Sequence, residues 1–359
     1  MSVSCSAFAS GEMDVAWAPS HATVGIVATD EEATQVFQLR YRVFVHELGR
    51  RGEGVDRARG ELTGQLDASS RLWQARDGQA LVGTITQTMI GPDFDLSLVP
   101  PELELNRFRS VAGLIGYSSR FAIDPTHRSL WVLPSLARHT YAHGRRLGAK
   151  FDFMATNPGL VPLFERMGYV RYTASSISSK AVGLLIPMVL PATDLAHLRR
   201  VRSACLPAAE HFASEPEWGE WLRATHPMIG HYYERDRRSK RVAALLQERV
   251  GLSANLADEV CELGYVHRFP AGTSLLREED RVTCAFVAME GELSVRRRRG
   301  RGAETLPRRA ADGVAYARGA MRCETDAEVL CVPVTAIARL QRRHPAHAAR
   351  LQELVSACD

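Results

Sequence analysis

The stretch from Ser118 to Leu136 constrains the fold most, because it predicts a β-strand, a turn and a helix in direct succession. Phe121 and Ile123 alternate with smaller or polar neighbours, which is typical of a strand. Pro125 fixes its own φ and disfavours a helical conformation at the residue before it, so the turn falls here.

A helix is predicted after this turn, since leucines recur at positions 130, 133 and 136. The first N–H groups of a helix lack intrahelical partners, and the dipole places positive charge at that end. Such an end can bind a phosphate, and Arg128 stands where a guanidinium would assist. The stretch alone is equally compatible with an ordinary α/β strand–turn–helix.

Length and composition predict a soluble, cytoplasmic protein of two domains. A chain of 359 residues exceeds a typical single core. The formal charge of +4 is small, so we expect no nucleic acid partner. We find no secretory signal, and the longest apolar run, 181–190, is too short for an integral membrane segment. The seven cysteines are scattered without a C-x-x-C pair, which favours reduced thiols and no metal site.

Local signals predict the order of elements before and after the central stretch. Residues 1–20 lack pattern and are expected to be a flexible tail. Thr29 and Glu32 form a capping box that opens a helix whose apolar face carries Phe37, Tyr41, Phe44 and Leu48. The segment 50–66 reads as a loop, and Asp77-Gly78 predicts a hairpin between strands at 71–75 and 80–90. An insertion or lid at 92–115, a helix at 133–147 and strands at 151–155 and 183–190 follow.

Two motifs resemble a known superfamily. The strand and turn at 118–128 resemble the cofactor strand of the Gcn5-related N-acyltransferase superfamily. The helix with Arg40, Phe44 and Leu48-Gly49 resembles the opening motif of acyl-homoserine-lactone synthases and N-acyl amino acid synthases. Asn157, Phe164 and Gly168-Tyr169 resemble the late motif of the superfamily, in the right order. The resemblance implies an α/β (α+β) acyl-CoA N-acyltransferase fold over residues 21–195.

The resemblance also implies a reaction and a site. A long acyl group would pass from acyl-CoA or acyl carrier protein, as a phosphopantetheine thioester, to an amine, with an amino acid as the favoured acceptor. The expected catalytic residues are Arg40, Glu47 and Asp67. The expected residues for the acyl donor are Arg120, Phe121, Ala122, Ile123, Arg128, Ser129, Leu130 and Trp131. The expected residues of the substrate pocket are Phe44, Tyr117, Asn157 and Phe164. A homodimer and a carrier-protein partner are open predictions.

The chain departs from the pattern of these synthases at three places. The second hairpin strand, 82–87, lacks their arginine, Arg50 stands where they carry a tryptophan, and Tyr117 replaces an expected glutamate. These three departures argue against homoserine lactone chemistry. Phe164 stands where many amine acetyltransferases place a proton-donating tyrosine. Two alternatives stay open: an acetyl-CoA-dependent acetyltransferase regulated by the second domain, and a non-catalytic sensor or scaffold.

The C-terminal part, 239–359, resembles a cyclic-nucleotide-binding β-roll, with a helical linker at 196–238 before it. The resemblance rests on Phe269-Pro270-Ala271-Gly272 and on the apolar run into Gly291-Glu292-Leu293. The span 312–321 lacks the glutamate that would bind a ribose, which leaves only Arg318 or Arg322 for a phosphate. We therefore expect a degenerate nucleotide pocket.

Overall fold

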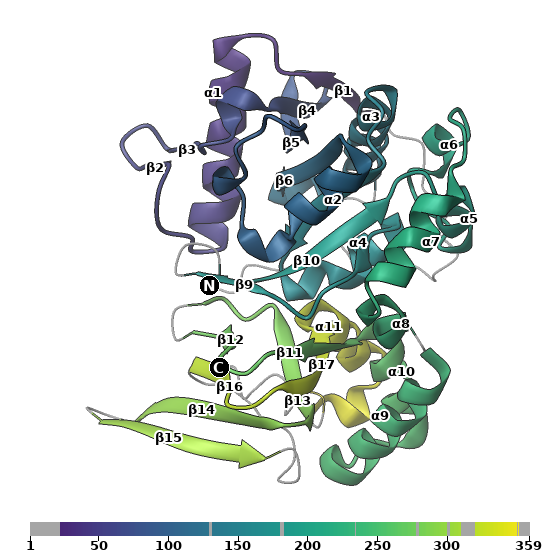
Figure 1. Cartoon of the computed structure of the whole chain (residues 1–359). Coiled ribbons are helices and arrows are strands. Elements are labelled where there is room, and N and C mark those ends of the chain that lie inside the picture. The colour runs from purple at the N-terminus through teal and green to yellow at the C-terminus, as the bar shows by residue number, and fades with distance from the viewer. Residues whose placement is uncertain are drawn as a thin grey trace. The chain divides into compact units, whose positions relative to one another are not determined.

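The computed structural model describes residues 22–128, 131–179, 183–233, 235–277, 280–299, 302–309, 320–349 and 351. The predicted tail at 1–20, Ser129, Leu130 and Arg318 lie outside these ranges. The chain forms two compact units (Figure 1). Unit 1 contains residues 1–155, 163–170 and 187–226, and unit 2 contains residues 156–162, 171–186 and 227–359. The predicted boundary at 238/239 falls inside one helix, α9 (Arg235–Val250).

The first half of the chain builds a mixed sheet in the order β1-β4-β5-β6-β7-β10-β8, with β9 paired to β10. Its strands are β1 Thr23–Ile26, β4 Arg71–Asp77, β5 Ala80–Ile90, β6 Ile115–Ile123, β7 Phe151–Thr156, β8 Val170–Arg171, β9 Ile177–Ser179 and β10 Gly183–Pro191. The hairpin β4–β5 turns at Gly78, whose φ of 56° suits glycine, as the Asp-Gly pair predicts.

Helices cover both faces of this sheet in unit 1 (Figure 1). They are α1 Asp30–Arg40 with a π-helical continuation at Tyr41–Glu47, α2 Leu105–Ala112, α3 Val132–Arg146, α4 Val161–Met167, α5 Leu195–Arg200, α6 Leu206–Ala209 and α7 Pro216–Thr225. The α3 helix packs closely on β5, since a Cβ at Gly83 would lie 2.6 Å from Cγ1 of Val132. Short 3-10 turns lie at Asp67–Ser69, Leu96–Leu98, Pro101–Leu103, Pro125–His127 and Pro158–Leu160.

The start of α1 follows the predicted capping box. The Thr29 hydroxyl accepts from the N–H of Glu32 at 3.2 Å, and the Glu32 carboxylate accepts from the N–H of Ala28 at 2.7 Å. The predicted apolar face is only partly right, because the buried side chains are those of Val36, Leu39, Arg40, Val43 and Phe44. The change to π-helical turns at Tyr41 shifts the face that the later residues present. The predicted loop 50–66 also contains a short hairpin, β2 (Val55–Asp56) with β3 (Glu61–Leu62).

Unit 2 contains two antiparallel sheets, β11-β17-β13 and β12-β16-β14-β15. Its strands are β11 Tyr265–Phe269, β12 Ser274–Leu276, β13 Cys284–Glu290, β14 Glu292–Arg299, β15 Gly302–Arg309, β16 Ala320–Cys323 and β17 Ala327–Pro333. Its helices are α8 Met228–Tyr233, α9, α10 Ala254–Leu263 and α11 Val334–Arg343, followed by a 3-10 turn at Pro345–His347. Aliphatic side chains from α9, α10, α11 and β17 share one core, which includes Leu246, Val260, Leu330 and Ile337.

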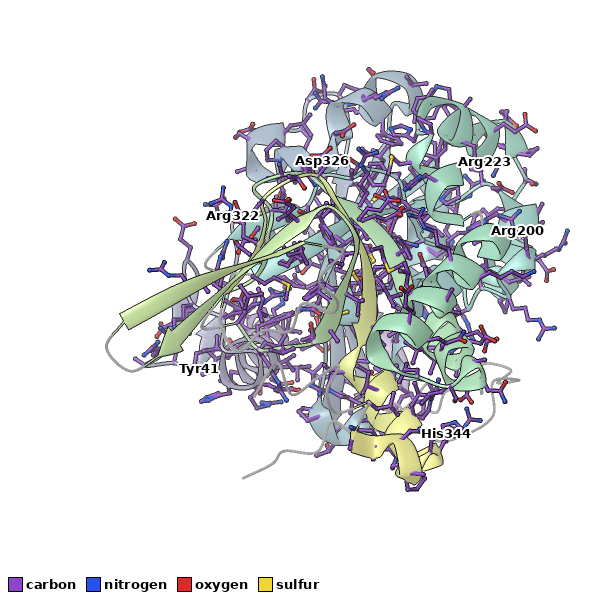
Figure 2. All side chains as sticks on the ribbon, turned by 90° about the horizontal axis from the view of Figure 1, so that it is seen from below. Tyr41, Arg200, Arg223, Arg322, Asp326 and His344 are labelled. Carbon is purple, nitrogen blue, oxygen red and sulfur yellow. The ribbon has the colours of Figure 1, made fainter. Side chains whose placement is uncertain are left out.

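The two glycines predicted at corners of the roll are both left-handed: φ is 84° at Gly272 and 86° at Gly291. Asp326, labelled in Figure 2, fixes the Gly272 corner by accepting from the N–H of Ala271 at 3.0 Å. It also pairs with Arg268 at 3.3 Å. The expected fold class is confirmed in its architecture: a mixed α/β sheet with helices in the first part of the chain and antiparallel sheets in the C-terminal part.

Candidate active site

The strand β6 pairs fully with β5 but only briefly with β7. Its ladder with β5 runs from Ile115 to Ile123, whereas the parallel ladder with β7 has two pairs, Gly116 with Asp152 and Tyr117 with Phe153. Beyond Tyr117, the strand ladders of the described residues assign β6 no further partner on its β7 side. Backbone amides at such an edge can bind an extended amide-containing arm.

A β-bulge lies in β6 beyond its last pair with β7. Thr86 faces Ser119 and Thr84 faces Ala122, so Ile85 alone opposes Arg120 and Phe121. Arg120 has a φ of 50°, which is uncommon for a residue with a side chain. Such strain is often found where a bulge redirects a side chain at a functional site.

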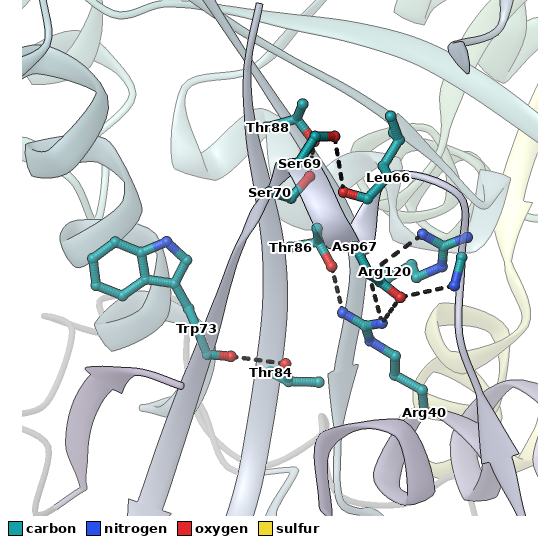
Figure 3. A network of polar contacts seen from close by, with 11 residues as sticks. Arg40, Leu66, Asp67, Ser69, Ser70, Trp73, Thr84, Thr86, Thr88 and Arg120 are labelled. Atoms are coloured by element: carbon teal, nitrogen blue, oxygen red, sulfur yellow. Dashed lines mark hydrogen bonds and ion pairs between the residues drawn. The ribbon is translucent and has the colours of Figure 1, made fainter. Parts of the chain in front are cut away.

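Asp67 connects two arginines that are far apart in sequence (Figure 3). Arg40 donates to Oδ1 and Oδ2 of Asp67 at 3.0 and 2.9 Å, and Arg120 lies 3.8 Å from Oδ1. The N–H of Gly64 also donates to Asp67, at 2.7 Å, and Arg40 donates to the Thr86 hydroxyl at 2.5 Å. The network therefore joins α1, the turn that Asp67 opens, β5 and the bulge of β6.

Arg40 is the most deeply enclosed member of this network. Its side chain is 0% exposed, and the loss of hydration lowers its pKa to about 10, although Asp67 acts in the opposite direction. The guanidinium therefore stays charged at neutral pH and depends on Asp67 for charge balance. This dependence explains why an arginine occupies a buried position of an apolar helix face.

Arg50 and Tyr117 lie beside the network. The guanidinium of Arg50 stacks 4.4 Å above the Phe44 ring, and burial together with the charge of Arg120 lowers its pKa to about 10. Burial raises the pKa of Tyr117 to about 12, against the effect of Arg120. Tyr117 is therefore neutral and supplies no charge at the position where the resemblance predicts a glutamate.

The structure brings Glu47 and Arg128 together in a bidentate ion pair. Both were predicted to serve the reaction separately, Glu47 near the amine and Arg128 at a phosphate. Each neutralises the other in this structure. The turn before Arg128 forms as predicted, since the Asp124 carboxylate accepts from the N–H of Thr126 at 3.0 Å. Trp131 precedes the first residue of α3.

Phe164, a predicted pocket residue, contacts two other aromatic side chains of unit 1. The Phe164 ring meets Phe121 edge-on at 6.1 Å and Tyr169 at 5.9 Å. The Tyr169 hydroxyl donates to Asp152, whose carboxyl is enclosed and has its pKa raised to about 6 by burial. Ala122 and Ile123 are buried.

Asn157, the fourth residue predicted for the substrate pocket, lies in unit 2. Its amide oxygen caps the turn at Pro158–Leu160 and accepts from Thr283 at 2.5 Å.

Sequence reasoning missed several members of the site. Thr86, Gly64, Asp152 and Tyr169 were not singled out as site residues, and Arg50 was noted only as a departure. The threonines at 84, 86 and 88 share one face of β5, which is the only sequence signal that could have pointed to Thr86. Within the described ranges, no set of three or more His, Cys, Asp and Glu side chains could bind a metal ion, and no helix is long and apolar enough to span a membrane.

Together, the helices on both faces of the sheet and the bulged strand that leaves its neighbour define unit 1 as an α/β domain with an edge of β6 beyond the β7 ladder. Residues 35–194 match the family model described as N-acyl amino acid synthase FeeM, which confirms the predicted resemblance over this segment. No curated protein matches the chain.

Several solved structures are similar to parts of the chain. FeeM, an N-acyl amino acid synthase from uncultured soil microbes, shares 16% identity, with 52% of this chain and 96% of that chain covered and a TM-score of 0.38. The AHL synthase LasI shares 17% identity, with 49% and 92% covered and a TM-score of 0.40. A cyclic nucleotide-binding domain from Methylobacillus flagellatus KT shares 17% identity, with 34% and 78% covered and a TM-score of 0.28.

Proposed function

We propose that the protein is an N-acyltransferase that moves a long acyl group from a phosphopantetheine thioester to the amine of an amino acid. The donor is acyl-CoA or acyl carrier protein. The observation that carries the proposal is the edge of β6 beyond Tyr117, which leaves the β7 ladder next to the Arg40–Asp67–Arg120 network. The match of residues 35–194 to the N-acyl amino acid synthase family supports it.

The reaction needs a backbone edge that binds the acyl donor and a charged group that binds the acceptor. The nitrogen of the acceptor attacks the thioester carbonyl, a C–N bond forms, and the C–S bond breaks to release the thiolate. Backbone N–H groups of β6 between Ser118 and Ile123 are suited to bind the donor arm and to stabilise the oxyanion. Arg120, with 27% of its side chain exposed, is suited to bind the carboxylate of the acceptor.

The two candidate bases have other partners, so we assign them positioning roles. Asp67 accepts from Arg40 and from the N–H of Gly64, and Glu47 is paired with Arg128. The amine proton therefore passes to solvent water in this proposal. Phe164 cannot protonate the leaving thiolate, so that proton is also drawn from water.

The test is a matrix of donors and acceptors with the full-length purified protein. Acyl-CoA and acyl carrier protein with chains from acetyl to palmitoyl are each incubated with the twenty amino acids, and free thiol and N-acyl product are measured by mass spectrometry. We expect products with long chains. A preference for acetyl-CoA would instead support the acetyltransferase alternative, and the absence of product and of thioester binding would support the non-catalytic sensor.

The oligomeric state is part of the same proposal. A homodimer and a docking site for acyl carrier protein remain predictions, which sedimentation of the protein with and without carrier protein would measure. Arg199→Gln, at an exposed ion pair on α5, serves as the matched control for the activity assays.

A further inference from the structure

The site of unit 1 holds more positive than negative charge. Arg40 and Arg120 share one carboxylate, that of Asp67, which Arg40 engages through both oxygens, and Arg50 lies over the Phe44 ring within the influence of the Arg120 charge. Arg120 reaches it only at 3.8 Å. Among the described residues, Arg50 has no ion pair, and its guanidinium contacts the Phe44 ring instead.

Three other carboxylates of unit 1 have arginine partners of their own, and Glu53 accepts from the Gln65 amide at 3.1 Å. Glu47 pairs with Arg128, Asp124 with Arg42 at 3.4 Å, and Glu61 with Arg59 at 3.2 Å. Tyr117 is neutral and adds no negative charge. Two guanidiniums, Arg50 and Arg120, therefore remain without a full counter-charge.

Packing holds these two guanidiniums in place. A Cβ at Gly64 would lie 1.9 Å from Nη2 of Arg120, so the guanidinium lies directly against this glycine. Arg50 is held over the ring of Phe44, which is itself buried. The charge of Arg120 lowers the pKa of both Arg40 and Arg50, which means that Arg120 repels each of them in a poorly hydrated place. Binding of an anion would relieve this repulsion.

We propose that Arg50 and Arg120 form a subsite for two carboxylates, so that the acceptor is an amino dicarboxylic acid of the aspartate or glutamate type. The proposal rests on the acyl transfer proposed above and deepens it. One carboxylate can satisfy one guanidinium through a bidentate pair, and the second guanidinium then selects the second acidic group. An amide in place of that group cannot compensate the charge, so glutamine and asparagine are poor acceptors.

The test compares acceptors that differ only in this charge. With a saturating long-chain thioester, kcat/KM is measured for glutamate against glutamine and for aspartate against asparagine. We expect the acid to exceed the amide by about tenfold or more, which is the usual effect of a hydrogen bond to a charged group. Arg50→Gln should lower kcat/KM for glutamate by the same factor and leave glutamine within twofold, and Arg50→Lys should restore part of the loss. Arg51→Gln, the same change at the next residue, is the matched control.

Three outcomes would overturn the proposal. They are equal use of acid and amide, an equal loss for both acceptors in Arg50→Gln, and a loss that appears in the KM of the thioester, which would assign the anion to the donor. Calorimetry of glutamate and glutamine binding without a donor separates this proposal from the reaction itself. Selective glutamate binding that Arg50→Gln weakens, without product from any pair, would retain the subsite and reject the acyl transfer.

Discussion

Replacement of Asp67 by asparagine tests how strongly the site contributes to the fold. The Arg40 side chain is 0% exposed and that of Asp67 is 10% exposed, so the variant leaves a buried guanidinium without its counter-charge. Removal of one partner from a buried ion pair costs about 3–5 kcal/mol. We expect the lower end of that range, because Thr86 still accepts from Arg40 and Asp67 is slightly exposed.

A double-mutant cycle separates the free energy of the Arg40–Asp67 ion pair from the cost of leaving the buried Arg40 charge without a partner. Asp67→Asn, Arg40→Met and the double variant are compared by urea unfolding, followed by tryptophan fluorescence and circular dichroism. We expect the double variant to be more stable than Asp67→Asn alone, because methionine removes the uncompensated charge. Glu210→Gln, at the exposed pair with Arg199, is the control and should cost under about 1 kcal/mol. A loss below about 1 kcal/mol in Asp67→Asn, or a double variant no more stable than it, would refute the reasoning.

Three further predictions concern the pH dependence of stability, the contact of Arg120 with Gly64, and a glycine corner of the β-roll. Burial lowers the pKa of His226 to about 4, so the unfolded chain takes up the proton first and stability falls as pH drops from about 6.5 to 4, by about 1–3 kcal/mol. His226→Phe should flatten that part of the stability–pH curve, and parallel curves for both proteins would contradict it. Gly64→Ala should displace the Arg120 guanidinium and lower kcat/KM for the acceptor, while the free energy of unfolding changes by less than about 1 kcal/mol. An unchanged kcat/KM would show that the contact of Arg120 with Gly64 does not position the guanidinium. Gly291→Ala should destabilise unit 2 by more than about 1 kcal/mol, because the φ of Gly291 is 86° and the new Cβ would lie 2.4 Å from the Asp326 carbonyl oxygen. Gly230→Ala, at an open position of α8, is the control and should not destabilise the unit. Equal melting temperatures of the two variants would disprove this prediction.

Elements with local signals could be predicted from the sequence. The Thr29 cap, the Asp77-Gly78 hairpin and the strand–turn–helix through Pro125 all form as expected, because each depends on residues within a few positions of one another. The corner positions of Gly272 and Gly291 could be predicted equally well, since left-handed corners favour glycine over other residues.

The arrangement of the site could not be read in this way, since it depends on contacts between distant residues. Arg40 was expected on the same helical face as Phe44, but its burial requires Asp67, which lies 27 residues further along the chain. The π-helical turns after Arg40 add a shift that a regular 3.6-residue period does not contain. The bulge at Arg120 likewise arises from the register between β5 and β6, which neither strand specifies alone.

The pairing of Glu47 with Arg128 changes where selectivity is expected. Taken singly, Arg128 follows the turn beside the donor strand and would favour a phosphate. Because Glu47 neutralises it through both oxygens, little of its charge is available to the donor arm. The uncompensated charge lies instead at Arg50 and Arg120. It follows that charge changes in the acceptor should alter the rate more than charge changes in the donor, so acyl-CoA and acyl-pantetheine should differ less than glutamate and glutamine.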